Sequence, residues 1–245
     1  SDRTSHIRSQ LKKLFLIVLL LALSIGLFGC EINKEYRDEN FKYRYQTYMN
    51  QNIIHLTGLT DEGKQKKYLY VPGRFKGWEV EISSTSILTD LVTLQSDVLE
   101  KLYVSVEIST LGYLIIGGDA KVFVISNKID FYSRCICNYV TSKRYYEINN
   151  DKNYSSINLA PANVSYIYNY EDAPNDGYYF IDDCNNELIE FVPDDPEREG
   201  YTFKGWYKEA ECASKWDFEI DIVPEKDDEE FIETKLYAKW DKINK

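Results

Sequence analysis

Few side chains in this chain have the type and spacing that catalysis requires. The sequence contains two histidines, and only His55 lies beyond the apolar segment near its start. A Ser–His–Asp or Cys–His arrangement would have to be built on it, yet it lies in "NIIHLTG", a stretch typical of a strand or turn. No motif of a nucleotide loop, a zinc protease or a nucleophile elbow occurs. We therefore expect no enzyme activity and no cofactor.

Carboxylates are abundant enough to consider separately. Adjacent acidic residues occur at 182–183, 194–195 and 227–230, beside Pro, Asn or further charges. That setting favours solvated loops over a site. Hydrolysis of a carbohydrate by paired carboxylates stays open as an alternative. Calcium is less favoured, because the D-x-D-x-D-G spacing of a calcium loop is absent.

Four cysteines beyond residue 30 could bind a metal or form disulfides. Cys135 and Cys137 form C-x-C, which differs from the C-x-x-C of redox and zinc sites. On a strand they would point to one face about 6.6 Å apart, near the upper limit for a relaxed disulfide. Cys184 and Cys212 stand alone. Small buried apolar residues are the favoured interpretation, with disulfides and a metal site as alternatives.

The start of the chain predicts export. Lys12 and Lys13 precede an apolar run from Leu14 to Phe28. Fifteen residues rise about 22 Å as a helix, which is short of the roughly 30 Å hydrocarbon core of a bilayer. A basic flank and a short apolar run are typical of a secretory signal, here residues 1–29. An uncleaved N-terminal anchor is the alternative, and a start codon upstream of Ser1 fits either case.

The ending "LFGC" resembles the box of bacterial lipoproteins, although Phe28 stands where a small residue is usual. The resemblance implies lipidation of Cys30 and attachment to the outer face of a cell membrane. Residues 30–40, polar and without apolar periodicity, would then be a tether.

The charge excludes one class of partner. The whole chain has a formal charge of −11 from 29 basic and 40 acidic residues. Loss of residues 1–29 removes four basic groups and one acidic group and leaves −14. Nucleic-acid binding needs a basic face, so we expect no nucleic-acid partner.

Beyond residue 40 the pattern is mostly that of strands. Short runs rich in Val, Ile, Tyr and Phe are separated by Gly, Asn, Asp and Ser. The expected strands are "FKYRY", "KKYLYV", "WEVEI", "KLYVSVEI", "YLIIGG", "KVFVIS" and "RYYEIN". Apolar residues at steps of three and four predict one short or broken helix in residues 83–102. The expected fold class is mainly β (α+β).

Residues 56–82 resemble the opening unit of BspA-type leucine-rich repeats. The resemblance rests on Thr57–Gly58, Leu69–Pro72 and Gly77–Val80. The later strands "KLYV", "YLII" and "KVFV" begin at Lys101, Tyr113 and Lys121, so their spacing is irregular. Residues 41–160 are therefore expected to be a degenerate repeat-like domain, or else a compact antiparallel domain with one helix.

The last eighty residues are rich in aromatic rings. "KWDFEID" alternates, so Trp216, Phe218 and Ile220 are expected on one face of a strand. "KLYAKW" alternates likewise, with Leu236, Ala238 and Trp240 inward, and Gly205 predicts a bulge in "GYTFKGWY". We expect the rings to form an aromatic core; a solvent-exposed stacking platform is the alternative.

The same residues resemble the Listeria–Bacteroides repeat, the β-grasp-like repeat of internalin-type surface proteins. The matching positions are Pro196, Arg198, Gly200, Tyr201, Phe203, Gly205, Trp206, Tyr207, Trp216, Asp217, Phe218, Leu236, Tyr237, Ala238 and Trp240. The resemblance implies a structural role for these residues in a module spanning 161–240, followed by a tail at 241–245. We expect residues 163–240 to fold alone.

These observations predict a membrane-anchored surface protein that interacts rather than catalyses. Its partner would be a host or envelope protein or a glycan. The alternative is a lipoprotein that binds a small ligand or hydrolyses a carbohydrate.

Overall fold

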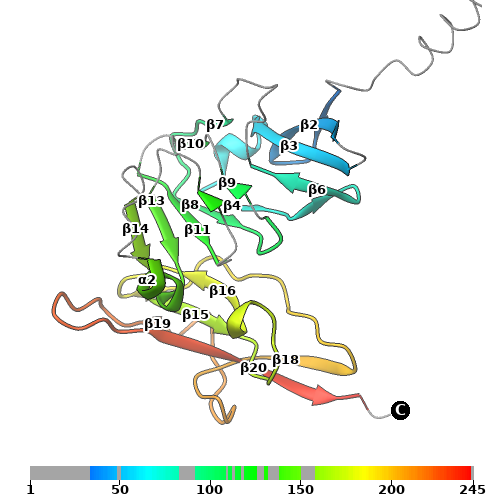
Figure 1. Ribbon diagram of the computed structural model, residues 1–245. Helices are drawn as coiled ribbons and strands as arrows, with labels where there is room; N and C mark the ends of the chain where they lie inside the picture. The colour runs from blue at the N-terminus through cyan, green and yellow to red at the C-terminus, as the bar shows by residue number, and fades with distance from the viewer. Residues whose placement is uncertain are drawn as a thin grey trace, which may run out of the picture. The chain divides into compact units, whose positions relative to one another are not determined.

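The computed structural model describes residues 34–48, 51–82, 92–108, 110–111, 114–116, 119–125, 130–131, 138–149 and 158–243. Within it, Glu35–Lys245 form one compact unit. The unit is mainly β-structure, as the sequence predicts (Figure 1). Cys30, the apolar run 14–28 and the cysteines at 135 and 137 lie outside the described residues. No helix among the described residues is long and apolar enough to cross a membrane.

The first sheet is mixed, with the strand order β1–β2–β3–β6–β5. Its strands are β1 (Glu35–Arg37), β2 (Phe41–Tyr48), β3 (Gln51–Leu59), β6 (Trp78–Glu81) and β5 (Arg74–Phe75), and the 3₁₀ turn η1 (Gly63–Gln65) follows β3. Residues 35–40 were expected to belong to a tether, but they form β1 and a tight turn. The Asp38 carboxylate accepts backbone N–H bonds from Asn40 (2.8 Å) and Phe41 (2.7 Å). This local turn chemistry folds the segment back onto β2.

The second sheet is parallel and has the order β14–β13–β11–β8–β4. Its strands are β4 (Tyr68–Val71), β8 (Lys101–Val104), β11 (Lys121–Val124), β13 (Asn138–Thr141) and β14 (Asn158–Pro161). They pair in register, so that Leu69, Leu102, Val122, Tyr139 and Leu159 form one row. From β8 onward, successive strands begin about 20 residues apart. The expected alternative of an antiparallel domain does not fit this sheet.

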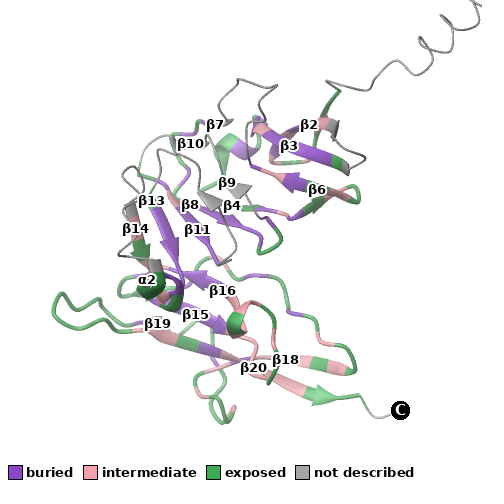
Figure 2. Ribbon diagram, in the orientation of Figure 1, coloured by how far each residue is buried: buried purple, intermediate pink, exposed green. Residues whose placement is uncertain are grey.

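The central strands of the parallel sheet, β8, β11 and β13, have buried side chains on both faces, and Figure 2 colours them mostly as buried. One face, with Leu102 and Val122, belongs to a core shared with the first sheet. The other, with Tyr103 and Phe123, belongs to a second core shared with the C-terminal residues. Strands buried on both faces read as continuous apolar runs, which explains why "KLYV" and "KVFV" lack alternation.

Two short parallel pairs correct the sequence-based interpretation of this region. Strand β7 (Val92–Leu94) pairs with β10 (Leu114–Ile116), and β9 (Thr110–Leu111) pairs with β12 (Asp130–Phe131). The run "YLII" therefore lies in a different sheet from "KLYV" and "KVFV". The spacing is irregular only when strands of the two sheets are counted as one series. The helix expected in residues 83–102 is wrong where it can be checked, because 92–94 and 101–102 are strand; residues 83–91 lie outside the described part.

The single described α-helix occurs where a strand was expected. "RYYEIN" lies in α2 (Lys143–Asn149). Ser142 explains the difference, because its Oγ accepts the N–H of Tyr145 (3.3 Å) and its carbonyl accepts that of Tyr146 (2.9 Å). This is N-cap geometry, and it outweighs the strand propensity of the two tyrosines.

The C-terminal sheet is mixed, with the order β16–β15–β20–β18. Its strands are β15 (Val164–Ile167), β16 (Tyr178–Asp182), β18 (Tyr201–Tyr207) and β20 (Thr234–Lys242), with the turn η2 (Asn175–Gly177) between β15 and β16. The first and last strands run parallel at the centre, and each has an antiparallel partner outside. A two-residue pair, β17 (Glu187–Leu188) and β19 (Ile222–Val223), joins the loops. No α-helix occurs in residues 158–243, which the structure describes without a gap.

The acidic pair at 182–183, expected to be solvated, is instead largely buried. Asp182 ends β16 at 0% exposure and accepts bonds from Lys101 Nζ (2.8 Å) and the Tyr103 hydroxyl (3.0 Å). Asp183 forms ion pairs with Lys121 (2.5 Å) and Lys226 (2.6 Å). The Asp182–Lys101 and Asp183–Lys121 pairs link the C-terminal sheet to the parallel sheet, whereas Lys226 belongs to the C-terminal segment itself. The boundary near residue 160 stays a prediction, but these contacts and the second core cross it.

Candidate ligand cavity in the aromatic module

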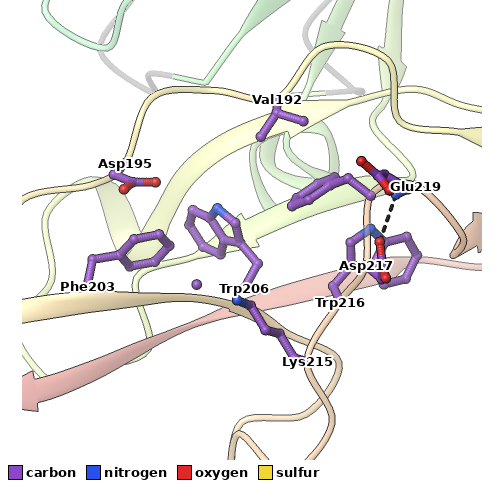
Figure 3. Close-up of a pocket in the computed structure, with 10 residues that line it drawn as sticks. Val192, Asp195, Phe203, Trp206, Lys215, Trp216, Asp217 and Glu219 are labelled. Carbon is purple, nitrogen blue, oxygen red and sulfur yellow. Dashed lines mark hydrogen bonds between the residues drawn. The ribbon is translucent and has the colours of Figure 1, made fainter.

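A cavity of 540 Å³ lies beside strand β18, in the segment rich in aromatic residues. Three pieces of chain line it: β18, the tryptophan loop (residues 208–221) and the proline loop (residues 189–199). Its rings are Phe203, Trp206, Trp216 and Phe218, and its polar groups are Asp195, Lys215, Asp217 and Glu219. Figure 3 shows Trp206 between Phe203 and Trp216, with Val192 and Asp195 on one side and Lys215 on the other. We call this the aromatic cavity.

Strand β18 positions the first two rings through a bulge at Gly205. The register with β20 shifts between Phe203 and Trp206, as the sequence predicts from that glycine. Gly205 has φ +114°, and a Cβ there would stand 2.7 Å from Lys215 Cε. The bulge lets Phe203 and Trp206 pack edge to face at 5.2 Å, and the stem of Lys215 covers the glycine.

The tryptophan loop is not the strand that its alternating pattern predicts. Residues 218–220 form a turn, and Ile220 is 72% exposed rather than inward. The Asp217 carboxylate accepts the N–H of Glu219 (2.9 Å), and the Asp221 carboxylate accepts the N–H of Asp217 (2.8 Å). Carboxylates that bond nearby backbone groups compete with strand pairing, and here they close a turn that leaves Trp216 buried and Phe218 half-buried.

The aromatic rings that line the cavity differ in exposure: the two tryptophans are buried and the two phenylalanines are partly accessible. Trp206 is 2% exposed and Trp216 is 7% exposed, while Phe203 and Phe218 are half-buried. Trp206 also meets Tyr166 edge to face (4.9 Å) and stacks on Tyr179 (5.7 Å). The two tryptophans are therefore mainly core residues, and the two phenylalanines are the rings a ligand can reach.

The remaining residues of the expected signature lie on the same sheet. Gly200, with φ +76°, precedes β18, where Tyr201 and Tyr207 are half-buried. On β20, Leu236 and Ala238 are fully buried. Tyr237 and Trp240 are half-buried, and the Trp240 indole N–H donates to the Tyr168 carbonyl (2.6 Å).

The indole N–H groups of Trp206 and Trp216 are buried and lack a hydrogen-bond partner among the described residues. Both nitrogens are covered, so a ligand in the cavity does not reach them as the side chains stand. An unsatisfied donor of this kind costs about 1–3 kcal/mol. Packing of the rings must outweigh that cost, which supports their role in the core.

Several carboxylates in the described part of the chain have lowered pKa values. The pKa of Asp221 lies below its usual value because it accepts the Asp217 backbone N–H and pairs with Lys208. Asp183 and Glu100 also have lowered pKa values beside lysines. A general acid for sugar hydrolysis needs the opposite shift, so these three groups are not candidates for that role, and none of them lines the aromatic cavity. His55 is buried in β3, with its Nδ1 3.8 Å from a Glu81 carboxylate oxygen, and is not among the residues that line the cavity.

The cysteines give no sign of a metal centre in the described part of the chain. Cys184 is buried beside Asp182, and burial raises the pKa of its thiol. Cys212 is half-buried, and both sulfurs are free thiols. Among the described residues, no three His, Cys, Asp or Glu side chains are grouped to hold a metal ion.

The mixed sheet and its ring cluster define a small aromatic-cored module that can present a cavity to a partner. Residues 163–239 match the family model described as the Listeria-Bacteroides repeat domain. The chain is also similar to Internalin H of Listeria monocytogenes, with 50% identity over 42 residues, which are 17% of this chain and 8% of that protein. A protein of Evansella cellulosilytica named as a candidate membrane protein is 32% identical over 77 residues, or 31% of this chain and 10% of that protein. A second, glycine-rich candidate membrane protein of that organism is 41% identical over 63 residues, or 25% and 6%. The chain thus spans a tenth or less of the length of these relatives.

Proposed function

We propose that this chain is a surface-associated, non-catalytic interaction protein whose repeat module binds a protein or glycan partner through the aromatic cavity. The repeat match at 163–239 and the similarity to an internalin and to proteins named for membranes support a surface location. The net charge of −11 disfavours nucleic acid as the partner.

One observation carries the binding role: half-buried Phe203 and Phe218 border a 540 Å³ cavity whose accessible edge is charged. Binding sites for small ligands are commonly concave, mostly apolar and furnished with a few polar groups. Lys215 and Glu219 supply such groups of both signs, so the cavity suits a partner with an apolar face and polar edges.

The test uses two residues of the same turn. The full chain, in a detergent without a sugar headgroup, is screened on arrays of glycans and of host and envelope proteins. Phe218→Ser should lose the strongest interaction, whereas Ile220→Ser, two residues away and outside the cavity, should keep it. Thermal melts of both variants check folding. Equal binding by the two variants, or no specific binding by the wild type, would contradict the proposal.

The membrane attachment is proposed to be a lipid on Cys30. Cells that express the wild type should incorporate labelled palmitate into this chain, and Cys30→Ala should abolish the label because the acceptor thiol is gone. Labelling of the alanine variant at the wild-type level would exclude Cys30 as the attachment point.

The N-terminal part is proposed to be a degenerate array related to BspA-type leucine-rich repeats. The in-register parallel strands and their step of about 20 residues support this, since one strand per 20–29 residues is the pattern of such arrays.

A further inference from the structure

A second cavity, of 280 Å³, lies where the parallel sheet meets the C-terminal sheet. Strand β4 contributes Tyr70 and the end of β8 contributes Val104 and Ser105. The hairpin β15–β16 contributes Tyr168 and Tyr179, and the proline loop closes one side with residues 191–194. We call this the tyrosine cavity. It shares only Val192 with the aromatic cavity among the described lining residues.

Three of the described tyrosines line this cavity, one from β4, one from β16 and one from the turn that follows β15. Tyr70 is 41% exposed and hydrogen-bonds Ser105. The rings of Tyr168 and Tyr179 meet edge to face at 5.2 Å, and the Tyr179 hydroxyl donates to the Asp194 carbonyl (2.7 Å). Burial first, and then the neighbouring phenols of Tyr170 and Tyr70, raise the pKa of Tyr168 to about 12. The hydroxyls of Tyr70 and Tyr168 stay protonated and can both donate and accept a hydrogen bond, whereas that of Tyr179 has given its hydrogen to Asp194 and can only accept.

The charge of the lining excludes anions. None of the described lining residues is Lys, Arg or His, while Asp194 contributes a carboxylate. The charges of Glu107 and Asp194 both act on Tyr70, which is one reason that its pKa is raised after burial. A phosphate or an acidic sugar would meet repulsion without a compensating cation.

The volume of the tyrosine cavity and its apolar wall limit further the kinds of ligand that fit. Val104, Ile125 and Phe180 are buried side chains on the lining. At roughly 30 Å³ per water in the liquid, the cavity has room for about nine waters, which is the scale of one sugar ring and its substituents. A ring with an apolar face and several hydroxyls at its edge matches an apolar wall bordered by neutral hydroxyls.

We propose that the tyrosine cavity binds one neutral hexopyranose unit of a glycan. The apolar face of the sugar would lie against the wall formed by Val104 and Phe180, and its hydroxyls would bond Tyr70, Tyr168 and Asp194. The inference rests on the proposed function in one respect, that an exported chain meets glycans, and it adds a sugar site separate from the aromatic cavity.

The experiment titrates the full chain, in a detergent without a sugar headgroup, with cellobiose, maltose, lactose and N,N′-diacetylchitobiose at millimolar concentration, followed by saturation-transfer NMR. At least one disaccharide should bind saturably, and digalacturonate should not. Tyr70→Phe and Tyr168→Phe each remove one hydroxyl and should weaken binding about three- to tenfold. Tyr207→Phe, on β18 and away from the cavity, should leave the affinity unchanged.

Three outcomes would overturn this proposal. One is no saturable binding of the four disaccharides, and another is stronger binding of digalacturonate. The third is a loss of sugar binding in Phe218→Ser but not in the Tyr70 and Tyr168 variants, which would assign the sugar to the aromatic cavity and leave the proposed function standing.

Discussion

At the scale of single residues, Trp206 combines a ring that is 2% exposed with an indole N–H that has no partner among the described residues. Its contribution to stability must therefore come from packing and not from hydrogen bonding. Asp182 and Asp183 differ from Trp206 in that their contribution depends on polar partners, because buried carboxylates are stable only when cations and hydrogen-bond donors surround them. Lys101 illustrates the balance: burial acts to lower its pKa, but the Asp182 charge raises it above the ordinary value.

Replacement of Trp206 tests the packing role. Trp206→Ala should lower the free energy of unfolding by about 3–5 kcal/mol, because it removes a large buried ring. Trp206→Phe keeps a ring and loses no hydrogen bond, so it should cost clearly less. Thermal and urea unfolding of the three proteins measure the difference. A melting temperature unchanged in the alanine variant would mean that this ring is a ligand platform and not part of the core.

The ion pairs of Asp183 predict a dependence of stability on pH. Burial alone would raise its pKa, but the hydrogen bonds and charges of Lys121 and Lys226 hold it below the ordinary 3.8. The folded-state pKa is thus depressed, so the stabilisation is present above pH 3.8 and is lost as the pH falls through the lower folded value. Asp183→Asn should cost about 1–2 kcal/mol at pH 6, since both lysines are partly exposed. Its stability should then fall less steeply between pH 4 and pH 2 than that of the wild type. Parallel acid slopes would remove Asp183 as the source.

At the scale of elements, the sequence predicts the strands β2, β4, β6, β8, β10, β11, β18 and β20. It misses the places where polar side chains override periodicity. The bulge at Gly205 and the alternation of β20 follow from glycine and from a half-buried pattern, and both are observed. The expected strand at 215–221 fails because two aspartates bond the backbone of a turn. The strand expected at 144–149 fails because Ser142 caps a helix. The cavities could not be foreseen, since each depends on loops that only tertiary contacts bring together.

Gly205 provides a test at this scale. Gly205→Ala should destabilise the C-terminal sheet by about 1–3 kcal/mol, because φ is +114° and a side chain there is strained. A second contribution to the destabilisation is the clash of the new Cβ with Lys215, but the flexible lysine side chain can move away and relieve it. The double variant with Lys215→Ala should therefore recover little of the loss in urea unfolding. Full recovery would mean that the contact, and not the backbone, requires glycine.

At the scale of the whole molecule, the C-terminal sheet does not complete its core from its own residues. Tyr103 of β8 stacks on Phe191 (4.5 Å) and lies 4.7 Å from Phe180 of β16. Its hydroxyl bonds Asp182, which also pairs with Lys101. The module was expected to fold alone, but aromatic contacts and ion pairs join it to the parallel sheet. We therefore expect residues 163–243 to fold in isolation with a lower free energy of unfolding than they have in the full chain.

The contacts between the two sheets predict that Asp182→Ala has different effects on the stability of the full chain and of the isolated fragment 163–243. In the full chain, Asp182→Ala should cost about 3 kcal/mol, because it strips a partner from Lys101 and from the Tyr103 hydroxyl. The isolated fragment 163–243 lacks Lys101 and Tyr103, so its Asp182 carboxylate has no partner from the parallel sheet. There, Asp182→Ala should leave the free energy of unfolding unchanged or raise it. Urea unfolding followed by tryptophan fluorescence gives the four free energies of this cycle. If Asp182→Ala costs the same in both proteins, the two sheets are not coupled through this residue. If the fragment shows no cooperative transition at all, the module depends on the parallel sheet even for folding, and the boundary near residue 160 does not separate two domains.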